Sequence, residues 1–291
     1  MIDSGEFSDS IESFRHPDFA YLFDVDGTLT EPEAKQVELP EIFDELARRL
    51  ERRQPIGLNT GRSSEFIVEK ILKPLEAHLT DATLLQRVFA TGELGAVQIT
   101  YGPQEERIEE LDQTFRVPET IQSEVRALAE HSPYREVMFY DETKQTMASV
   151  ELLPKEQLRG RTLDDFRAAQ QTLIEDMRKI LVAHDTEGKL NITSTRIATD
   201  IHHALAGKAL GARKFLTFLE QKNIHPRRFL AFGDSQSDYE MYRGLRDAGA
   251  RAHLVFVGDR ELLREDLREE VIFSRERVDK GTLEFLVEQK L

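Results

Sequence analysis

Short, uninterrupted apolar runs alternate with helical segments in the first part of the chain, and this order constrains the fold more than any other feature. The runs are FAYLF (19–23), PIGLN (55–59) and QRVFAT (86–91). FAYLF is apolar at every position, which is typical of a strand that is covered on both faces, and PIGLN and QRVFAT are also strand-like. The segment ELPEIFDELARRLERR (38–53) carries apolar residues at helical spacing. Strands that alternate with helices in this way predict a parallel α/β sheet.

A different pattern occupies the middle of the chain. After about residue 97, alternation of apolar and polar residues replaces the continuous runs, and it predicts one hairpin over 135–152 and a second over 189–203. Helical segments are expected near 118–131 and 162–183. Hairpins with one polar face, together with helices, indicate a separate α+β domain of ordinary size.

The first pattern then returns, with strands predicted at RFLAFG (228–233) and AHLVFVG (252–258) between helical segments. A domain interrupted by another domain explains this order most simply. We therefore expect an α/β fold in which a Rossmann-like parallel-sheet core, residues 1–97 and 204–291, contains an inserted α+β cap domain, residues 98–203.

The composition excludes several classes of function. The chain has 291 residues, no cysteine and a formal net charge of −15. A disulfide framework, a cysteine-ligated zinc and a cysteine nucleophile are therefore excluded, and a nucleic acid is not expected as a partner. No run approaches the roughly 18 apolar residues of a membrane span, and residues 1–14 lack a signal-peptide core. We expect a cytoplasmic protein with no membrane partner, and the oligomeric state stays open.

Residues suited to chemistry follow the predicted strands of the core. In open α/β sheets, ligands bind beyond the carboxyl ends of the strands, so these residues are expected to share one site. They are Asp24 and Asp26 after the first strand, Thr60 after the second, Asp234 and Asp238 after a late strand, and Lys208 near the start of a helix.

A cation and a phosphate group are both expected at this edge of the sheet. Carboxylates about 4 Å apart repel by about 4 kcal/mol per pair at an effective dielectric near 20. Oxygen ligands in a site that also takes phosphate favour Mg²⁺. Phosphate is indicated by Gly27 and Gly61, which let backbone N–H groups approach an anion, by the helix start after Arg62, and by the charge of Lys208.

Four short motifs occur in a fixed order: DVDGTLT (24–30), NTGR (59–62), Lys208 and GDSQSDYEM (233–241). On these motifs the chain resembles the haloacid dehalogenase superfamily of phosphotransferases, in the branch with a large C2-type cap between the second and third motifs. It is similar to the Cof-type, sucrose-phosphatase-like sugar-phosphate phosphatases of that superfamily. The resemblance spans nearly the whole chain, and the cap sequence contributes least to it.

The resemblance implies a role for each motif residue. Asp24 would be the nucleophile that forms an aspartyl-phosphate. Asp26 would protonate the leaving oxygen and then activate water. The remaining implied roles are substrate-phosphate binding by Thr60, Gly61, Arg62 and Lys208, and Mg²⁺ binding by Asp24, Asp26 through its backbone carbonyl, Asp234 and Asp238.

Two positions depart from the family pattern. Ser237 stands where many relatives carry Asn, and Glu93-Leu94-Gly95 stands where Glu-Asn-Gly is often found. The function we expect is that of a Mg²⁺-dependent phosphomonoester hydrolase that acts on a small phosphorylated metabolite, with a sugar phosphate as the favoured substrate. A phosphomutase and a catalytically silent metabolite-binding protein stay open as alternatives.

Overall fold

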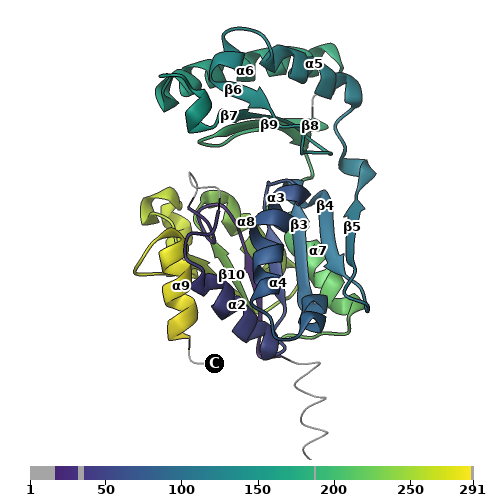
Figure 1. Cartoon of the computed structure of the whole chain (residues 1–291), viewed down its shortest axis with the longest axis vertical. Coiled ribbons are helices and arrows are strands. Elements are labelled where there is room, and N and C mark those ends of the chain that lie inside the picture. The colour runs from purple at the N-terminus through teal and green to yellow at the C-terminus, as the bar shows by residue number, and fades with distance from the viewer. Residues whose placement is uncertain (1–16, 32–35, 187, 290–291) are drawn as a thin grey trace, which may run out of the picture. The chain divides into compact units, whose positions relative to one another are not determined.

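The computed structural model describes residues 17–31, 36–186 and 188–289 (Figure 1). Residues 1–14, in which the sequence predicts no signal-peptide core, lie outside the described residues. The chain divides into two compact units. The first contains the described residues up to Glu110 and those from Gly207 onward, and the second is Leu111–Ala206.

The first unit is built on an eight-stranded sheet of order β12-β11-β10-β1-β2-β3-β4-β5. The strands from β12 to β3 pair in parallel, and β4 is antiparallel to β3. This mostly parallel sheet confirms the predicted α/β fold. The strands are β1 (Phe19–Phe23), β2 (Ile56–Asn59), β3 (Val88–Gly92), β4 (Val97–Tyr101), β5 (Arg107–Leu111), β10 (Arg228–Gly233), β11 (Ala252–Phe256) and β12 (Val271–Phe273).

Helices pack against both faces of this sheet (Figure 1). Along β1, Tyr21 and Phe23 belong to one core cluster while Ala20 and Leu22 belong to the other, and all four side chains are buried. The continuous apolar run is therefore explained by a strand with two covered faces. The first cluster includes residues of α2 (Glu41–Glu51), α3 (Ser64–Ile67), a π-helical turn (Val68–Leu72), α4 (Lys73–Ala77) and α9 (Val278–Glu288), and the second includes residues of α7 (Lys208–Gln221) and α8 (Gln236–Asp247).

The boundary between the units lies later than residue 97, where the sequence analysis placed it. Strands β4 and β5 belong to the large sheet, and the second unit begins at Leu111. The difference arises because β4 alternates buried and partly buried residues, a pattern shared with strands of an open-faced domain. β5 is a mostly exposed strand at the sheet edge, so its sequence has no apolar pattern from which a strand could be predicted. The role of the second unit as a cap stays a prediction.

The second unit contains a four-stranded sheet of order β6-β7-β9-β8. The pairs β6–β7 and β8–β9 are antiparallel, which confirms the two predicted hairpins. Two helices share one core with this sheet. Within the described part of the chain, no helix has the length and apolarity needed to cross a membrane. The elements are α5 (Glu119–Ala129), β6 (Met138–Tyr140), β7 (Ala148–Leu152), α6 (Leu163–Ala183), β8 (Leu190–Ser194) and β9 (Ala198–His203).

Candidate active site

Asp24 directly follows β1 and is buried at the carboxyl end of the large sheet. Its backbone N–H donates to the carbonyl of Phe232 in β10 at 2.9 Å, and its carboxylate accepts from the backbone N–H of Val25 at 2.7 Å. The loop that follows needs a glycine, because Gly27 has φ +73° and a Cβ there would lie 2.2 Å from Oδ2 of Asp234. The two loops are therefore held in close contact.

Asp234 follows β10, and Asp238 lies in the first turn of α8. Ser235 caps this helix in a capping box with Asp238. Oδ2 of Asp238 accepts from the backbone N–H groups of Asp234 at 3.1 Å and Ser235 at 3.0 Å, and from the Ser235 hydroxyl at 2.8 Å. The fully buried Asp238 carboxylate is thus fixed by local structure.

Lys208, the first residue of α7, connects the carboxylates that come from different strands. Its buried ammonium forms ion pairs with Asp24 and, at 3.0 Å, with Oδ1 of Asp238. It also donates to the backbone carbonyl of Asn59 at 2.8 Å, and the Asn59 amide donates to the carbonyl of Lys208 at 2.7 Å. A single amine therefore contacts residues that follow β1, end β2 and begin α8.

The carboxylates of Asp24, Asp234 and Asp238 offer ligand atoms that lie within 4.8 Å of one another. Both oxygens of Asp238 already face donors, Oδ2 through the helix cap and Oδ1 through Lys208. Asp234, in contrast, forms no ion pair with any residue that the structure describes. A set of oxygen ligands that is buried at Asp24 and Asp238 and partly buried at Asp234, with surplus negative charge, fits a hard divalent cation such as Mg²⁺. Asp24 and Asp234 are its most available ligands.

The surplus charge is also expressed in the pKa values of the cluster. Burial raises the pKa of Asp24 well above its usual range; Lys208 opposes this shift, and the neighbouring carboxylates add to it. Burial, followed by the charge of Asp238, raises the pKa of Asp234 to about 7. Burial alone would lower the pKa of Lys208, but Asp238 and Asp24 outweigh it and raise this pKa. A divalent cation would relieve this repulsion.

Arg62 holds the second carboxylate of the first motif. Its Nε and Nη2 donate to the two oxygens of Asp26 at 2.9 and 2.6 Å, and its guanidinium packs over the ring of Phe66 at 4.7 Å from the centroid. The Thr60 hydroxyl accepts from the backbone N–H of Arg62 at 3.2 Å. Gly61 lies between them, and a Cβ there would be 3.6 Å from the side chain of Leu94.

The structure thus brings Asp24, Asp234, Asp238 and Lys208 together, and joins Arg62, which the sequence analysis assigned to phosphate, to Asp26. Their chemical roles stay predictions.

Asn59 is a site residue to which the sequence analysis gave no role. Besides its two bonds with Lys208, its side-chain oxygen accepts from the Thr91 hydroxyl at 3.2 Å. A Cβ on Gly211 would lie 2.2 Å from that oxygen, so α7 approaches Asn59 closely. The signal available in the sequence was a polar side chain at the end of an apolar strand, within the NTGR motif.

The fold of this chain resembles that of several solved structures, although no protein-family model matches it. A search of curated proteins also finds no match. The C-terminal domain of C. albicans trehalose-6-phosphate phosphatase aligns with a TM-score of 0.63 and 14% identity, covering 94% of this chain and 91% of that chain.

Two further structures are similar. Aspergillus fumigatus trehalose-6-phosphate phosphatase aligns with a TM-score of 0.53 and 17% identity over 95% of both chains. An N-terminally truncated, IMP-bound Plasmodium falciparum IMP-nucleotidase aligns with a TM-score of 0.53 and 10% identity, covering 95% of this chain and 69% of that chain. At identities this low, the structural alignments show a shared α/β fold alone.

Proposed function

We propose that this protein is a phosphatase of the haloacid dehalogenase type, which hydrolyses a small phosphorylated metabolite through an aspartyl-phosphate on Asp24. The observation that carries the proposal is the contact of Lys208 with both Asp24 and Asp238, beside Asp234. Residues from three distant parts of the sequence thereby form one buried cluster of the composition that phosphoryl transfer requires.

In the first half of the reaction, a carboxylate oxygen of Asp24 attacks phosphorus. The new P–O bond to Asp24 forms as the ester P–O bond breaks, and Asp26 gives its proton to the departing alcohol oxygen. Lys208 and Thr60 hold the phosphoryl oxygens. The bidentate contact with Arg62 occupies both oxygens of Asp26, so one of them must leave Arg62 to carry the proton to the leaving group; we assign Arg62 to positioning Asp26 rather than to binding phosphate.

In the second half, water attacks the aspartyl-phosphate. Asp26 takes a proton from that water, the P–O bond to Asp24 breaks, and inorganic phosphate leaves with Asp24 restored as a carboxylate. Asp24, Asp234 and the backbone carbonyl of Asp26 would hold Mg²⁺, with Asp238 beside them. When bound, the ion would neutralise the negative charge that nucleophile and phosphate bring together.

A sugar phosphate is the substrate class that we favour. Two of the proteins of similar fold are trehalose-6-phosphate phosphatases, and another is an IMP-nucleotidase. The four-motif resemblance independently points to sugar-phosphate phosphatases. Trehalose 6-phosphate, sucrose 6-phosphate and IMP therefore belong in the first substrate panel, and the second unit is proposed to select among them.

Phosphate release from this panel, with Mg²⁺ or with a chelator, tests the proposal. In Asp24→Asn we expect release to fall by roughly 10⁴-fold or more, because the nucleophile is lost. Asp18→Asn is the matched control, since it makes the same chemical change at an exposed residue just before β1. Interconversion that needs a bisphosphorylated activator and releases little phosphate would identify a phosphomutase. Mg²⁺ binding with no turnover of any compound would identify a silent binding protein.

A further inference from the structure

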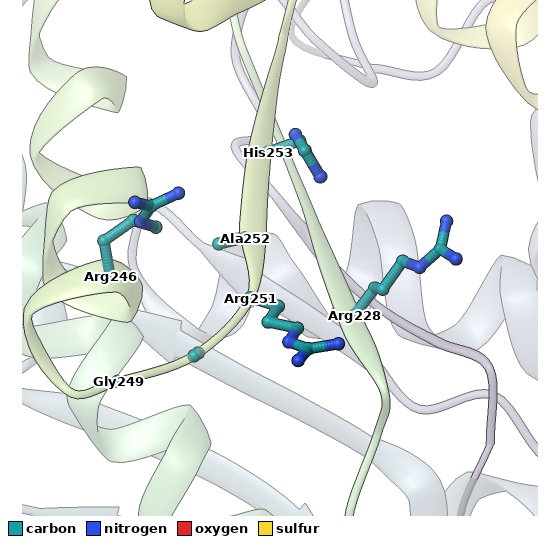
Figure 2. A pocket seen from close by; sticks show the side chains of 7 residues that line it. Arg228, Arg246, Gly249, Arg251, Ala252 and His253 are labelled. Atoms are coloured by element: carbon teal, nitrogen blue, oxygen red, sulfur yellow. The ribbon is translucent and has the colours of Figure 1, made fainter.

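A second concave surface of the first unit lies at the amino ends of β10 and β11. β10 begins at Arg228 and ends just before Asp234, so this surface and the acidic cluster are at opposite ends of the same strand. It contains an open cavity of about 430 Å³ (Figure 2). The cavity is lined by Arg228, Arg246, Gly249, Ala250, Arg251, Ala252 and His253.

Three exposed arginines from different elements surround this cavity, which we call the arginine pocket. Arg228 begins β10, Arg246 lies in the last turn of α8, and Arg251 directly precedes β11. None of the three forms an ion pair with a residue in the described ranges. In a chain with 54 acidic and 39 basic residues, three arginines without carboxylate partners at one cavity form a local positive region.

Aromatic rings contact two of these arginines without neutralising their charge. The guanidinium of Arg228 packs 5.8 Å from the ring centroid of Phe19, and that of Arg246 packs 5.9 Å from the ring centroid of Tyr242.

The neighbouring carboxylates are engaged by other arginines. Asp18 pairs with Arg227 at 3.5 Å, and Asp247 pairs with Arg243 at 3.2 Å. The donors of the arginine pocket are therefore left for a ligand.

We propose that the arginine pocket binds a small anion that carries two phosphate groups. A guanidinium presents a planar fork of N–H donors that matches phosphate oxygens. Figure 2 shows Arg246 on one side of β11 and Arg228 on the other, an arrangement that suits two anionic groups better than one. The volume falls within the range of small-molecule sites, and Gly249, whose Cβ position is open, leaves room for close approach.

Two kinds of molecule share this chemistry, and the test distinguishes them. A nucleoside diphosphate carries adjacent phosphates, whereas a bisphosphorylated sugar carries separated ones. The probes are inorganic pyrophosphate for the shared chemistry, ADP for adjacent phosphates and fructose 1,6-bisphosphate for separated phosphates. Binding is measured by isothermal titration calorimetry with a chelator present, because the metal-free acidic cluster then repels the same probes.

The variant Arg228→Gln/Arg251→Gln removes two charges from the pocket, and Arg167→Gln/Arg178→Gln removes two exposed arginines from α6 in the other unit. We expect the dissociation constant of the bound probe to rise at least about tenfold in the first variant and to change less than about twofold in the second. Binding should also weaken as salt rises from about 0.05 to 0.5 M.

The proposal is supported if ADP or fructose 1,6-bisphosphate binds wild type, binds more weakly to Arg228→Gln/Arg251→Gln and binds more weakly at high salt. The probe that binds shows whether the pocket prefers adjacent or separated phosphates. The proposal is overturned if no probe binds wild type below about 1 mM, or if both double variants bind equally well. Because the readout is binding without turnover, it is independent of whether the protein is a phosphatase.

Discussion

Each unit of the protein buries one lysine between two carboxylates, and the two arrangements differ in instructive ways. Lys208 pairs with Asp24 and Asp238 in the first unit. Lys144 in the second unit lies 3.3 Å from Asp200 and 3.6 Å from Glu151. Both ammonium groups are buried, so each needs its carboxylates in order to stay charged.

The surroundings of the two lysines indicate that Lys208 belongs to a functional site and Lys144 to a structural ion pair. Lys144 joins side chains within strands, including the Ser149 hydroxyl at 2.9 Å, and Ser149 pairs with Asp200 across β7 and β9. Lys208 lies where strands end, beside a third carboxylate, Asp234, that has no ion pair with any described residue. The unpaired negative charge at the strand ends can be neutralised by a ligand, which is typical of a binding site. The balanced charges around Lys144 instead connect strands of one sheet, which is typical of a structural ion pair.

Replacing each lysine by methionine should give the largest contrast between the two units. Removing one partner from a buried ion pair costs about 3–5 kcal/mol, so both Lys208→Met and Lys144→Met should lower the free energy of unfolding by similar amounts. Phosphate release per folded molecule should fall roughly 10²–10³-fold in Lys208→Met, because a stabilising charge is lost. It should change less than about tenfold in Lys144→Met. Urea unfolding and phosphate-release assays measure the two quantities.

An equal loss of turnover in folded Lys144→Met would contradict the contrast. The Lys144 cluster would then belong to substrate recognition.

Mg²⁺ should stabilise the first unit in a pH-dependent way. Burial raises the pKa of Asp24 well above its usual range and that of Asp234 to about 7, so the folded protein holds protons that the unfolded chain has released. Both groups therefore contribute stability at low pH that is lost as pH rises, and for Asp234 the loss occurs between about pH 4 and about pH 7.

Since Mg²⁺ binds the ionised carboxylates, it should raise the melting temperature by roughly 5 °C at pH 8 and by much less at pH 5. Differential scanning fluorimetry at both pH values checks this, with Asp234→Asn expected to lose the response. A shift of equal size at both pH values would mean that the ion binds elsewhere.

Alanine substitutions at two glycines, one in each unit, distinguish the effect of backbone strain from that of crowding at the acidic cluster. Gly27 has φ +73° and Gly160 has φ +90°, so alanine at either position should cost about 1–2 kcal/mol. Only at Gly27 would the new Cβ meet a side chain, 2.2 Å from Asp234 Oδ2, whereas nothing lies within 4 Å of that position at Gly160. Gly27→Ala should therefore also weaken Mg²⁺ binding, and Gly160→Ala should leave it unchanged. Calorimetric titration measures the Mg²⁺ affinity of each variant. Equal affinities of Gly27→Ala and wild type would mean that Asp234 moves away from the new Cβ without loss of the metal site.

The smallest expected effect is a gain in stability at Leu94. Its φ of 59° and ψ of 33° lie in the left-handed region, which a leucine adopts at a cost and an asparagine tolerates. Leu94→Asn should raise the free energy of unfolding by up to about 1 kcal/mol. A rise of roughly 2–4 °C in melting temperature would show it. A lower melting temperature would mean that packing of the leucine outweighs the backbone cost.

The convergence of Asp24, Asp234 and Asp238 could be predicted from the sequence because β1 and β10 are parallel, so the residues after them share one edge. Strand β5 could not be predicted from the sequence, since the exposed residues of an edge strand carry no apolar pattern. The contact between Arg62 and Asp26 could not be predicted either. It depends on the directions of two side chains that follow different strands, and spacing within one strand does not determine such directions.

Strand β1 pairs with β10 through Phe19 and Arg228, which lie more than two hundred positions apart in the chain. During synthesis on the ribosome, Asp24 therefore emerges long before Lys208, Asp234 and Asp238, while the strands of the second unit pair only with one another. All strands of the second unit have therefore been synthesised before the acidic cluster is complete. A nascent chain stopped before β10 would expose one edge of β1, a surface open to mispairing until β10 has been synthesised.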